Sequence, residues 1–236
     1  MRTKLFKSAE RGHANHGWLD AYHTFSFASW YDPDRVHFGL LRVLNDDTVA
    51  PGMGFGKHPH DNMEIVTIPL SGALKHSDST GRNEVIKAGE VQIMSAGRGI
   101  QHSEFNASST EPVKLFQIWV FPKERDIEPR YDQRDFGAAA MKDQLRTVVS
   151  PEKTDDALWI NQDAYFSLGK FETASEIEYK IRHKGNGAFI MIVEGGAEVD
   201  GSQLGRRDAI GVSETDAVKI KVEANTEILV IEVPMN

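Results

Sequence analysis

Two pairs of metal-ligand residue types stand out in the sequence: His58 with His60, and His102 with Glu104. The members of each pair are two residues apart, and such residues point to the same face of a β-strand. Two strands of this kind facing each other in a small barrel would offer three imidazoles and a carboxylate to one ion. That set suits iron, nickel, copper, cobalt, manganese or zinc, and does not suit calcium or magnesium.

A further carboxylate, Glu64, follows His60 by four residues and falls on the same face if the alternation continues. The pattern alone therefore leaves Glu64 and Glu104 open as the carboxylate ligand. A lone His-x-His is a weak signal, and the competing interpretation is that these histidines are structural. His76 and Asp78 form another such pair beside a turn, which we expect to consist of a turn-capping Asp78 and an exposed His76.

The segments around these residues read as short strands separated by turns. Apolar runs predict strands at 40–44, 64–70, 84–86, 91–94 and 114–120, with Asn45-Asp46-Asp47 as a turn after the first. A charged segment from Pro122 predicts one short helix around residues 137–145. Strands are expected again at 164–169, 176–181, 188–193, 219–222 and 228–233. Many short strands without a long amphipathic helix indicate an all-β sandwich or barrel.

The two halves of the chain show a weak internal repeat, since Ile68–Leu74 resembles Ile192–Glu198. On that register the places of His58, His60 and His102 fall near residues that are not histidine, namely Arg182, Lys184 and Lys219 or Ile220. His183 is the only histidine of the second half. The sequence therefore predicts two barrels with one metal site, in the first.

The spacing around the histidines resembles the two motifs of the cupin superfamily. Gly52-x5-His58-x-His60-x3-Glu64-x7-Gly72 follows the first motif. Gly89-x5-Ser95-x-Gly97-x4-His102-x3-Asn106 resembles the second, with Ser95 where proline is usual and two extra residues before the histidine. Other segments narrow the resemblance to the pirin family: His23–Ala28, Asp32-Pro33, His58–His60, His76–Ser79, Ser95–Gly97 and His102–Asn106. It covers the whole chain and is richest in motifs up to Pro122.

The resemblance, which extends to bacterial pirin-like proteins assigned quercetin 2,3-dioxygenase activity, implies an all-β bicupin with few short helices. It implies an N-terminal cupin domain over residues 1–128 that holds the metal, a connecting segment over 129–150, and a C-terminal cupin-like domain without metal ligands over 151–236. The implied ligands are His58, His60, His102 and Glu104. The implied cofactor is one divalent transition metal ion, expected to be Fe(II), with Ni, Cu, Co, Mn and Zn as alternatives.

The activity implied is cleavage of a flavonol such as quercetin at the 2,3 position with O2 and loss of carbon monoxide. Glu104 would act as general base toward the flavonol 3-hydroxyl. Glu64 would orient an imidazole or serve as the alternative ligand. The resemblance equally carries a second hypothesis, a non-enzymatic regulatory module whose ion shapes a surface for a protein partner. Loss of quercetin absorbance in air would distinguish the two.

Composition limits the other classes of function. The chain has 236 residues and a net charge of −8, which argues against binding to nucleic acid or anionic lipid. It has no Cys, which removes disulfides, thiolate nucleophiles and Cys-ligated metals. The N-terminus lacks the apolar core of a signal peptide, and the longest apolar run, Leu115–Phe121, is too short to span a bilayer. A soluble, cytoplasmic protein is expected.

Overall fold

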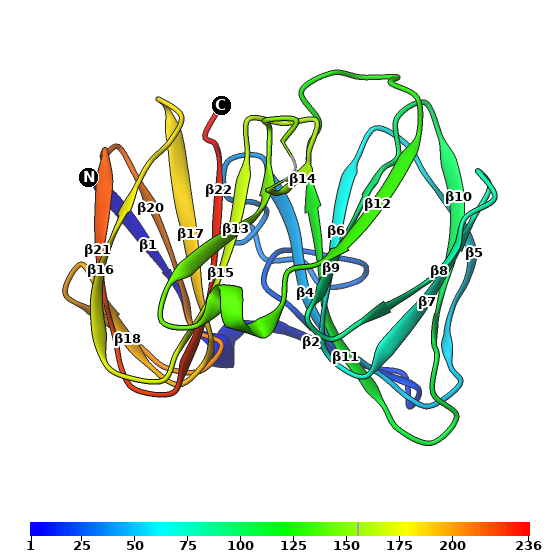
Figure 1. Ribbon diagram of the computed structural model, residues 1–236, viewed down its shortest axis with the longest axis horizontal. Helices are drawn as coiled ribbons and strands as arrows, with labels where there is room; N and C mark the ends of the chain where they lie inside the picture. Colours follow the sequence, from blue (N-terminus) through cyan, green and yellow to red (C-terminus); the bar gives the residue numbers. More distant parts are fainter. Residues whose placement is uncertain (155) are drawn as a thin grey trace.

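Two β-barrels side by side make up the computed structural model, which describes residues 1–154 and 156–236 (Figure 1). Each barrel is formed by one seven-stranded and one four-stranded sheet. The helices of the described residues are two short 3-10 helices, η1 (Ser8–Glu10) and η2 (Ala138–Met141). The predicted all-β, two-barrel architecture is confirmed.

The first barrel holds the predicted metal ligands. Its larger sheet has the order β12 (Arg130–Asp135), β9 (Glu90–Ser95), β6 (Glu64–Ser71), β11 (Val113–Val120), β4 (Leu41–Val49), β3 (Leu19–His23) and β2 (Gly12–Asn15). Its smaller sheet has the order β5 (Gly54–His60), β10 (Ile100–Asn106), β7 (Ala73–Asp78) and β8 (Asn83–Lys87). Because side chains alternate along each strand, each of the two sheets turns one face toward the barrel interior.

The second barrel repeats this order position by position. Its larger sheet runs β1 (Arg2–Phe6), β20 (Ala209–Ser213), β17 (Asn186–Glu194), β22 (Thr226–Pro234), β15 (Tyr165–Phe171), β13 (Leu145–Ser150) and β14 (Leu158–Trp159). Its smaller sheet runs β16 (Ser175–Lys180), β21 (Ala217–Val222), β18 (Ala197–Val199) and β19 (Ser202–Leu204). The internal repeat suggested by the sequence therefore corresponds to a repeated topology.

The edge strand of the second barrel's large sheet comes from outside that barrel's run of strands. β1 pairs antiparallel with β20, so the first strand of the chain belongs to the second barrel. In the equivalent place of the first barrel, β12 pairs antiparallel with β9. The domain limits at residues 128 and 151 stay a prediction, and they do not include this exchange of β1.

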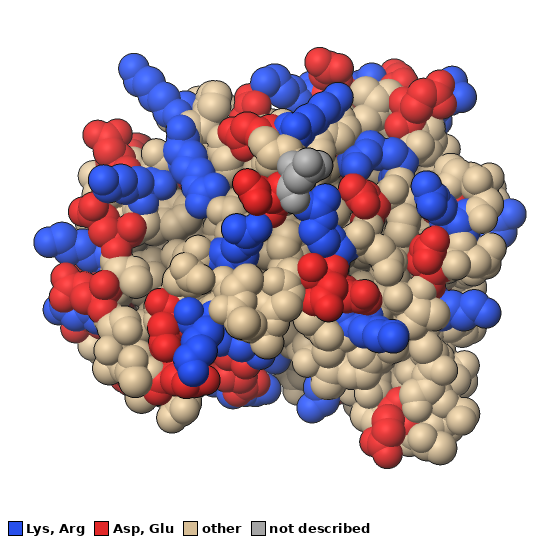
Figure 2. Space-filling model, viewed as in Figure 1, with Lys and Arg blue, Asp and Glu red and all other residues tan. Residues whose placement is uncertain are grey.

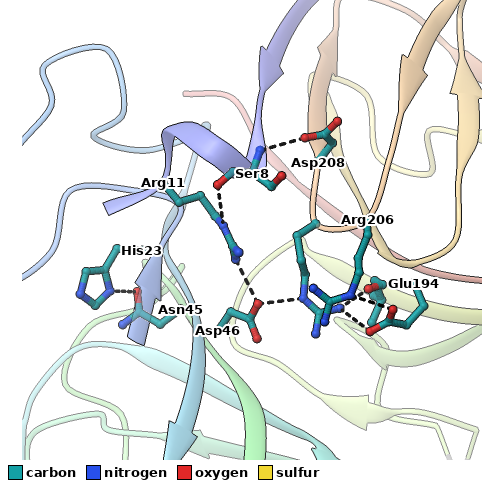
Figure 3. Close-up of polar contacts among 10 residues, drawn as sticks. Ser8, Arg11, His23, Asn45, Asp46, Glu194, Arg206 and Asp208 are labelled. Atoms are coloured by element: carbon teal, nitrogen blue, oxygen red, sulfur yellow. Dashed lines mark hydrogen bonds and ion pairs between the residues drawn. The ribbon is translucent and has the colours of Figure 1, made fainter. Parts of the chain in front are cut away.

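Ion pairs and hydrogen bonds hold the segment that follows β1, residues 7–11, against both barrels (Figure 3). Asp46 on β4 accepts hydrogen bonds from Arg11 at 3.1 Å and from Arg207 of the second barrel at 2.8 Å. Asp208 accepts from the Ser8 backbone amide and the Lys7 ammonium, both at 2.8 Å. The N-terminal segment is thereby held against strands from both halves of the chain.

The two large sheets share one apolar core where their outer faces meet. Its members come from both barrels, including Leu44, Val66, Phe116, Phe166, Phe189 and Leu229. Burying this apolar surface favours a fixed arrangement of the barrels, because separating them would expose it to water. The metal-site barrel is therefore supported from behind by the second barrel.

Two local predictions were wrong. Asn45-Asp46-Asp47 is no turn, because β4 continues through it to Val49 between β3 and β11. The helix expected around 137–145 is limited to η2 (Ala138–Met141), and Leu145 already begins β13. The first error matters for the site. Asn45 and Asp47 are two residues apart on β4, so both lie on the face that lines the barrel interior.

Charges of both signs are interspersed on the face shown in Figure 2. Exposed ion pairs on the molecule include Lys142 with Glu172 and Arg98 with Glu128. In the described part of the chain, no helix has the length and apolar character needed to cross a membrane.

Candidate metal centre

Three histidines converge inside the first barrel. His58 and His60 lie on β5 and His102 on the neighbouring β10, with His102 directly opposite His58. The ring centroids are 4.4 Å apart for His58 and His102, 4.8 Å for His60 and His102, and 4.9 Å for His58 and His60. One ligand atom from each residue lies within 4.8 Å of the other two. The structure thus brings together the three histidines singled out in the sequence.

An irregularity in β5 helps to orient His58. The register between β5 and β10 shifts between His102 and Glu104, since His102 pairs with His58 while Glu104 pairs with Phe55. The extra residue on β5 forms a bulge, a feature common beside active sites. The Gly56 carbonyl accepts a hydrogen bond from His58 Nδ1 at 2.8 Å. Because a carbonyl can only accept, Nδ1 carries the proton and Nε2 is left as the ligand atom.

His102 carries the clearest sign of a missing partner. It is 1% exposed, and neither ring nitrogen has a hydrogen-bond partner among the described residues. Burial, with the neighbouring His58 and His60, lowers the pKa of His102 to about 2. Burial and His58 lower the pKa of His60 to about 4. Both imidazoles are therefore neutral near pH 7, which is the form that binds a metal ion.

Glu104 lies on the same strand face as His102 and is buried. Its Oε2 atom accepts a hydrogen bond from the Gln117 side-chain amide at 2.9 Å. Oε1 has no partner in the described chain, and burial raises the pKa of the carboxyl to about 7. Ligand atoms of Glu104, His102 and His76 lie within 4.8 Å of one another. Glu104 is thus linked to the three-histidine cluster through their shared member, His102.

His76 was expected to be exposed, and this was wrong. It is fully buried on β7, opposite Glu104, because β7 lies between β10 and β8 and this position faces inward. Its Nε2 atom bonds Asp78 at 2.9 Å, and its ring lies 5.3 Å from that of His102. Asp78 also accepts from the Thr80 amide, as expected of a turn-capping residue.

Glu64 is not brought to the cluster. It lies on β6 in the larger sheet, on the same strand face as Val66 and Ile68 of the core between the barrels. Its Oε2 atom accepts from the Ser95 hydroxyl at 2.8 Å and from the backbone amide of Asn161 at 3.1 Å. The alternation that predicted a shared face with His60 is interrupted at Asn62, whose positive φ of 45° marks a turn between β5 and β6.

A cavity of about 470 Å³ adjoins the histidines, which is large enough for a small organic molecule. His58, His60 and Glu104 form part of its wall. Its aromatic lining consists of Trp18, Phe27, Phe55 and Trp119. Its remaining polar lining consists of His23, Asn45, Asp47 and Gln117.

Comparison with protein families agrees with this architecture. Residues 5–120 match the model described as Pirin, and residues 147–233 match the model described as Quercetinase C-terminal cupin domain. The chain is 43% identical to the quercetin 2,3-dioxygenase of Escherichia coli strain K12, over 98% of each chain. This chain belongs to the pirin family. It is also 41% identical to a putative quercetin 2,3-dioxygenase of Pseudomonas aeruginosa, over 94% of this chain and 95% of that protein.

Solved pirin structures share the fold over nearly the full chain. The crystal structure of YhhW from E. coli matches with a TM-score of 0.94 and 42% identity, covering 99% of this chain and 98% of that one. The structure of YhhW in complex with nickel(II) matches with a TM-score of 0.93 and 41% identity, covering 99% of each chain. A metal-bound relative is thus known within the family.

Several cavity residues of this pirin were not singled out from its sequence. His23 Nδ1 and Asn45 Oδ1 are joined at 2.9 Å, and these side chains lie on adjacent strands (Figure 3). Gln117 is directly opposite Asn45 on β11. The available signal was the alternation Val43, Asn45, Asp47, Val49 along one strand, which a turn prediction concealed.

Proposed function

We propose that this pirin is a metal-dependent dioxygenase that opens a flavonol such as quercetin at the 2,3 position with O2. The observation that carries the proposal is the cluster of His58, His60 and His102 at the wall of a cavity lined with aromatic side chains. The relatives named quercetin 2,3-dioxygenase support the substrate class. Three imidazoles and a carboxylate are a ligand set for a divalent transition metal.

The proposed ligands are the three histidines together with Glu104. One unpartnered nitrogen of His102 and the unpartnered Oε1 of Glu104 fit this assignment, because buried polar atoms without partners are costly unless a ligand satisfies them. We propose Fe(II) as the ion, with Ni, Cu, Co, Mn and Zn as the alternatives. When bound, such an ion supplies Lewis-acid and template chemistry for the substrate oxygen and for O2.

The cavity walls would hold the flat flavonol rings. Trp119 lies edge-on to His60 with ring centroids 5.0 Å apart, and Phe27 lies edge-on to Trp119 at 5.4 Å. These rings form an apolar wall beside the histidines. The wall and the imidazoles together would position the 3-hydroxyl of the flavonol toward the site.

Glu104 is the proposed general base. Gln117 holds one carboxylate oxygen by a 2.9 Å hydrogen bond. Oε1, the oxygen proposed as the ligand atom, would accept the proton of the 3-hydroxyl if it loosens from the ion. Glu64 has no such role in the proposal, because its hydrogen bonds go to Ser95 and Asn161.

Elemental analysis of the purified protein, combined with an aerobic assay of quercetin absorbance and carbon monoxide release, tests the proposal. We expect about one transition metal ion per chain and loss of the flavonol only in the metal-loaded protein. Metal binding without flavonol loss would contradict the enzymatic assignment and favour the regulatory hypothesis. Absence of metal from protein grown with a full metal supply would contradict the site itself.

A further inference from the structure

The Asp47 carboxyl lies in the cavity wall without the partners that a buried acid requires. Asp47 is 5% exposed, and its Oδ1 atom has no hydrogen-bond partner among the residues described. The charged groups that act on it, Asp46 and Glu104, are both acidic. Burying a carboxyl in this way is costly unless something satisfies it. A ligand in the cavity is the candidate.

The surroundings of Asp47 are apolar. On the sheet it lies between Ala21 of β3 and Leu115 of β11. Trp18 and Phe55, whose ring centroids are 5.2 Å apart, line the same cavity. Asn45, two residues earlier on the same strand face, is already bonded to His23. We call the part of the cavity formed by these apolar side chains the apolar arm. Asp47 is its acidic group, and the hydrogen-bonding capacity of its polar neighbour Asn45 is already used by His23.

We propose that Asp47 determines substrate specificity by hydrogen-bonding a phenolic hydroxyl of the flavonol, with Trp18 and Phe55 packing beside the ring that carries it. This inference rests on the proposed function and names the polyhydroxylated flavonols as its preferred substrates. A site built to hydrogen-bond a substrate hydroxyl discriminates strongly against an analogue that lacks it, because the polar group of the protein is then left unpaired.

Anaerobic binding of two flavonols tests the proposal without turnover. Quercetin carries ring hydroxyls that 3-hydroxyflavone lacks, and both have the 3-hydroxyl. The test measures the Kd of each flavonol on metal-loaded protein through quenching of tryptophan fluorescence. It compares the wild type, Asp47→Leu and Asp47→Asn. The control is Asp20→Asn, which removes a carboxylate from the adjacent strand on the opposite, exposed face.

The expected result is a change in preference. In Asp47→Leu, the ratio of the two Kd values should shift against quercetin by about tenfold or more, as expected for loss of a buried hydrogen bond. Asp47→Asn should retain most of the preference, because an amide can still bond a hydroxyl. Asp20→Asn should leave the ratio at its wild-type value. An equal loss of affinity for both flavonols in Asp47→Leu would overturn the proposal.

The thermal stability of the ligand-free protein gives a second readout. If Asp47 is kept for binding, replacing its unsatisfied carboxyl by leucine should raise Tm, since the apolar arm then has no desolvated polar group. A lower Tm, or failure of Asp47→Leu to fold, would show a structural role and overturn the proposal. Wild-type protein that binds neither flavonol would contradict the proposed function together with this inference, whereas an unchanged preference in Asp47→Leu would contradict this inference alone.

Discussion

The two barrels have the same strand order, but the interior of the first carries ionisable side chains where the interior of the second is apolar. In the smaller sheet of the first barrel, Glu104 on the central strand β10 lies between Phe55 and His76. In the second barrel, Ile220 on the central strand β21 lies between Ile177 and Val199. The apolar core of the second barrel is filled by Ile190, Val218, Val222, Ile228, Val230 and similar residues. One backbone plan therefore serves as a packed support in one copy and, in the other, encloses a cavity lined by aromatic side chains with a few polar groups.

Buried carboxylates sharpen this contrast. Glu232 of the second barrel is fully buried and accepts hydrogen bonds from the Tyr179 hydroxyl, the Asn186 amide and the backbone of Arg182. Glu104 and Asp47 of the first barrel each have an oxygen without a partner in the described chain. Glu64 also has one oxygen without a partner in the described chain, although its other oxygen bonds Ser95 and Asn161. A missing partner therefore marks a candidate ligand position only where the group also faces the cavity, as Glu104 and Asp47 do.

The largest expected effect comes from removing a histidine of the first barrel. His58→Ala should lose most bound metal and reduce flavonol cleavage to background, a larger loss than the roughly 10–100-fold that follows removal of a residue orienting a ligand. His183→Ala, which changes the only histidine of the second half, should keep both. Metal content by elemental analysis and the quercetin assay measure the two effects. Full metal content in His58→Ala would break the contrast between the barrels.

Exchanging each glutamate for glutamine should separate the two carboxylates of the first barrel. Glu104→Gln should lower turnover about 10²–10⁴-fold, the range for loss of a general base. Glu64→Gln should keep wild-type metal content, because Glu64 bonds Ser95 and Asn161 rather than the cluster. Metal content and kcat are measured for both variants. Metal loss in Glu64→Gln with full metal in Glu104→Gln would transfer the ligand role to Glu64.

Placing the acid of the first barrel into the second should destabilise the protein. Ile220→Glu buries a carboxyl among apolar side chains and should cost about 4 kcal/mol in the free energy of unfolding. Lys219→Gln, at the exposed neighbouring position, should change it by less than about 0.5 kcal/mol. Urea denaturation measures both. Equal stability of the two variants would show that the second interior tolerates polar groups as the first does.

The smallest effect concerns the contact that fastens β1 to the second barrel. Burial opposes ionisation of Asp208, but hydrogen bonds from Lys7, Ser8 and Gly205 outweigh it and lower its pKa. A lowered pKa stabilises the fold above the unfolded pKa of about 4, and this stabilisation is lost as pH falls through the folded value. Asp208→Asn should therefore cost about 2 kcal/mol at pH 7 and progressively less below pH 4. Urea denaturation across this pH range would contradict the assignment if the difference were constant.

The sequence predicted the strands and the shared face of His58 and His60 because both depend on local alternation, whereas the approach of His102 to them was implied by the spacing of the two motifs. Strand β6 (Glu64–Ser71) was expected at 64–70, and β11 (Val113–Val120) at 114–120. His58 and His60 share a face because two residues on one strand suffice to define it. The alternation stops at a turn, so the same reasoning misplaced Glu64 beyond Asn62.

Features that depend on distant partners were not predictable in this way. The register of the repeat suggested Arg182 and Lys219 as counterparts of the histidines, but Arg182 follows the end of β16 and Lys219 is exposed. The inward positions of the corresponding strands in the second barrel are instead occupied by core residues such as Tyr179 and, opposite it, Val218. Asn45 and Asp47 read as a turn because their strand propensity is low, and tertiary pairing with β3 and β11 overrides it. Such conflicts between local preference and structure are expected at functional positions.

The exchange of β1 has a consequence for biosynthesis. Its residues are made before the other described strands, whereas their pairing partner, Ala209–Ser213, comes after almost all of them in the chain. Strand β1 must therefore remain unpaired until β20 has been made, and the large sheet of the second barrel cannot be completed before then. Contacts so distant along the chain form late and slowly. Completion of the second barrel, which supports the metal-site barrel through the shared apolar core, therefore depends on a strand that precedes the whole first barrel in the chain.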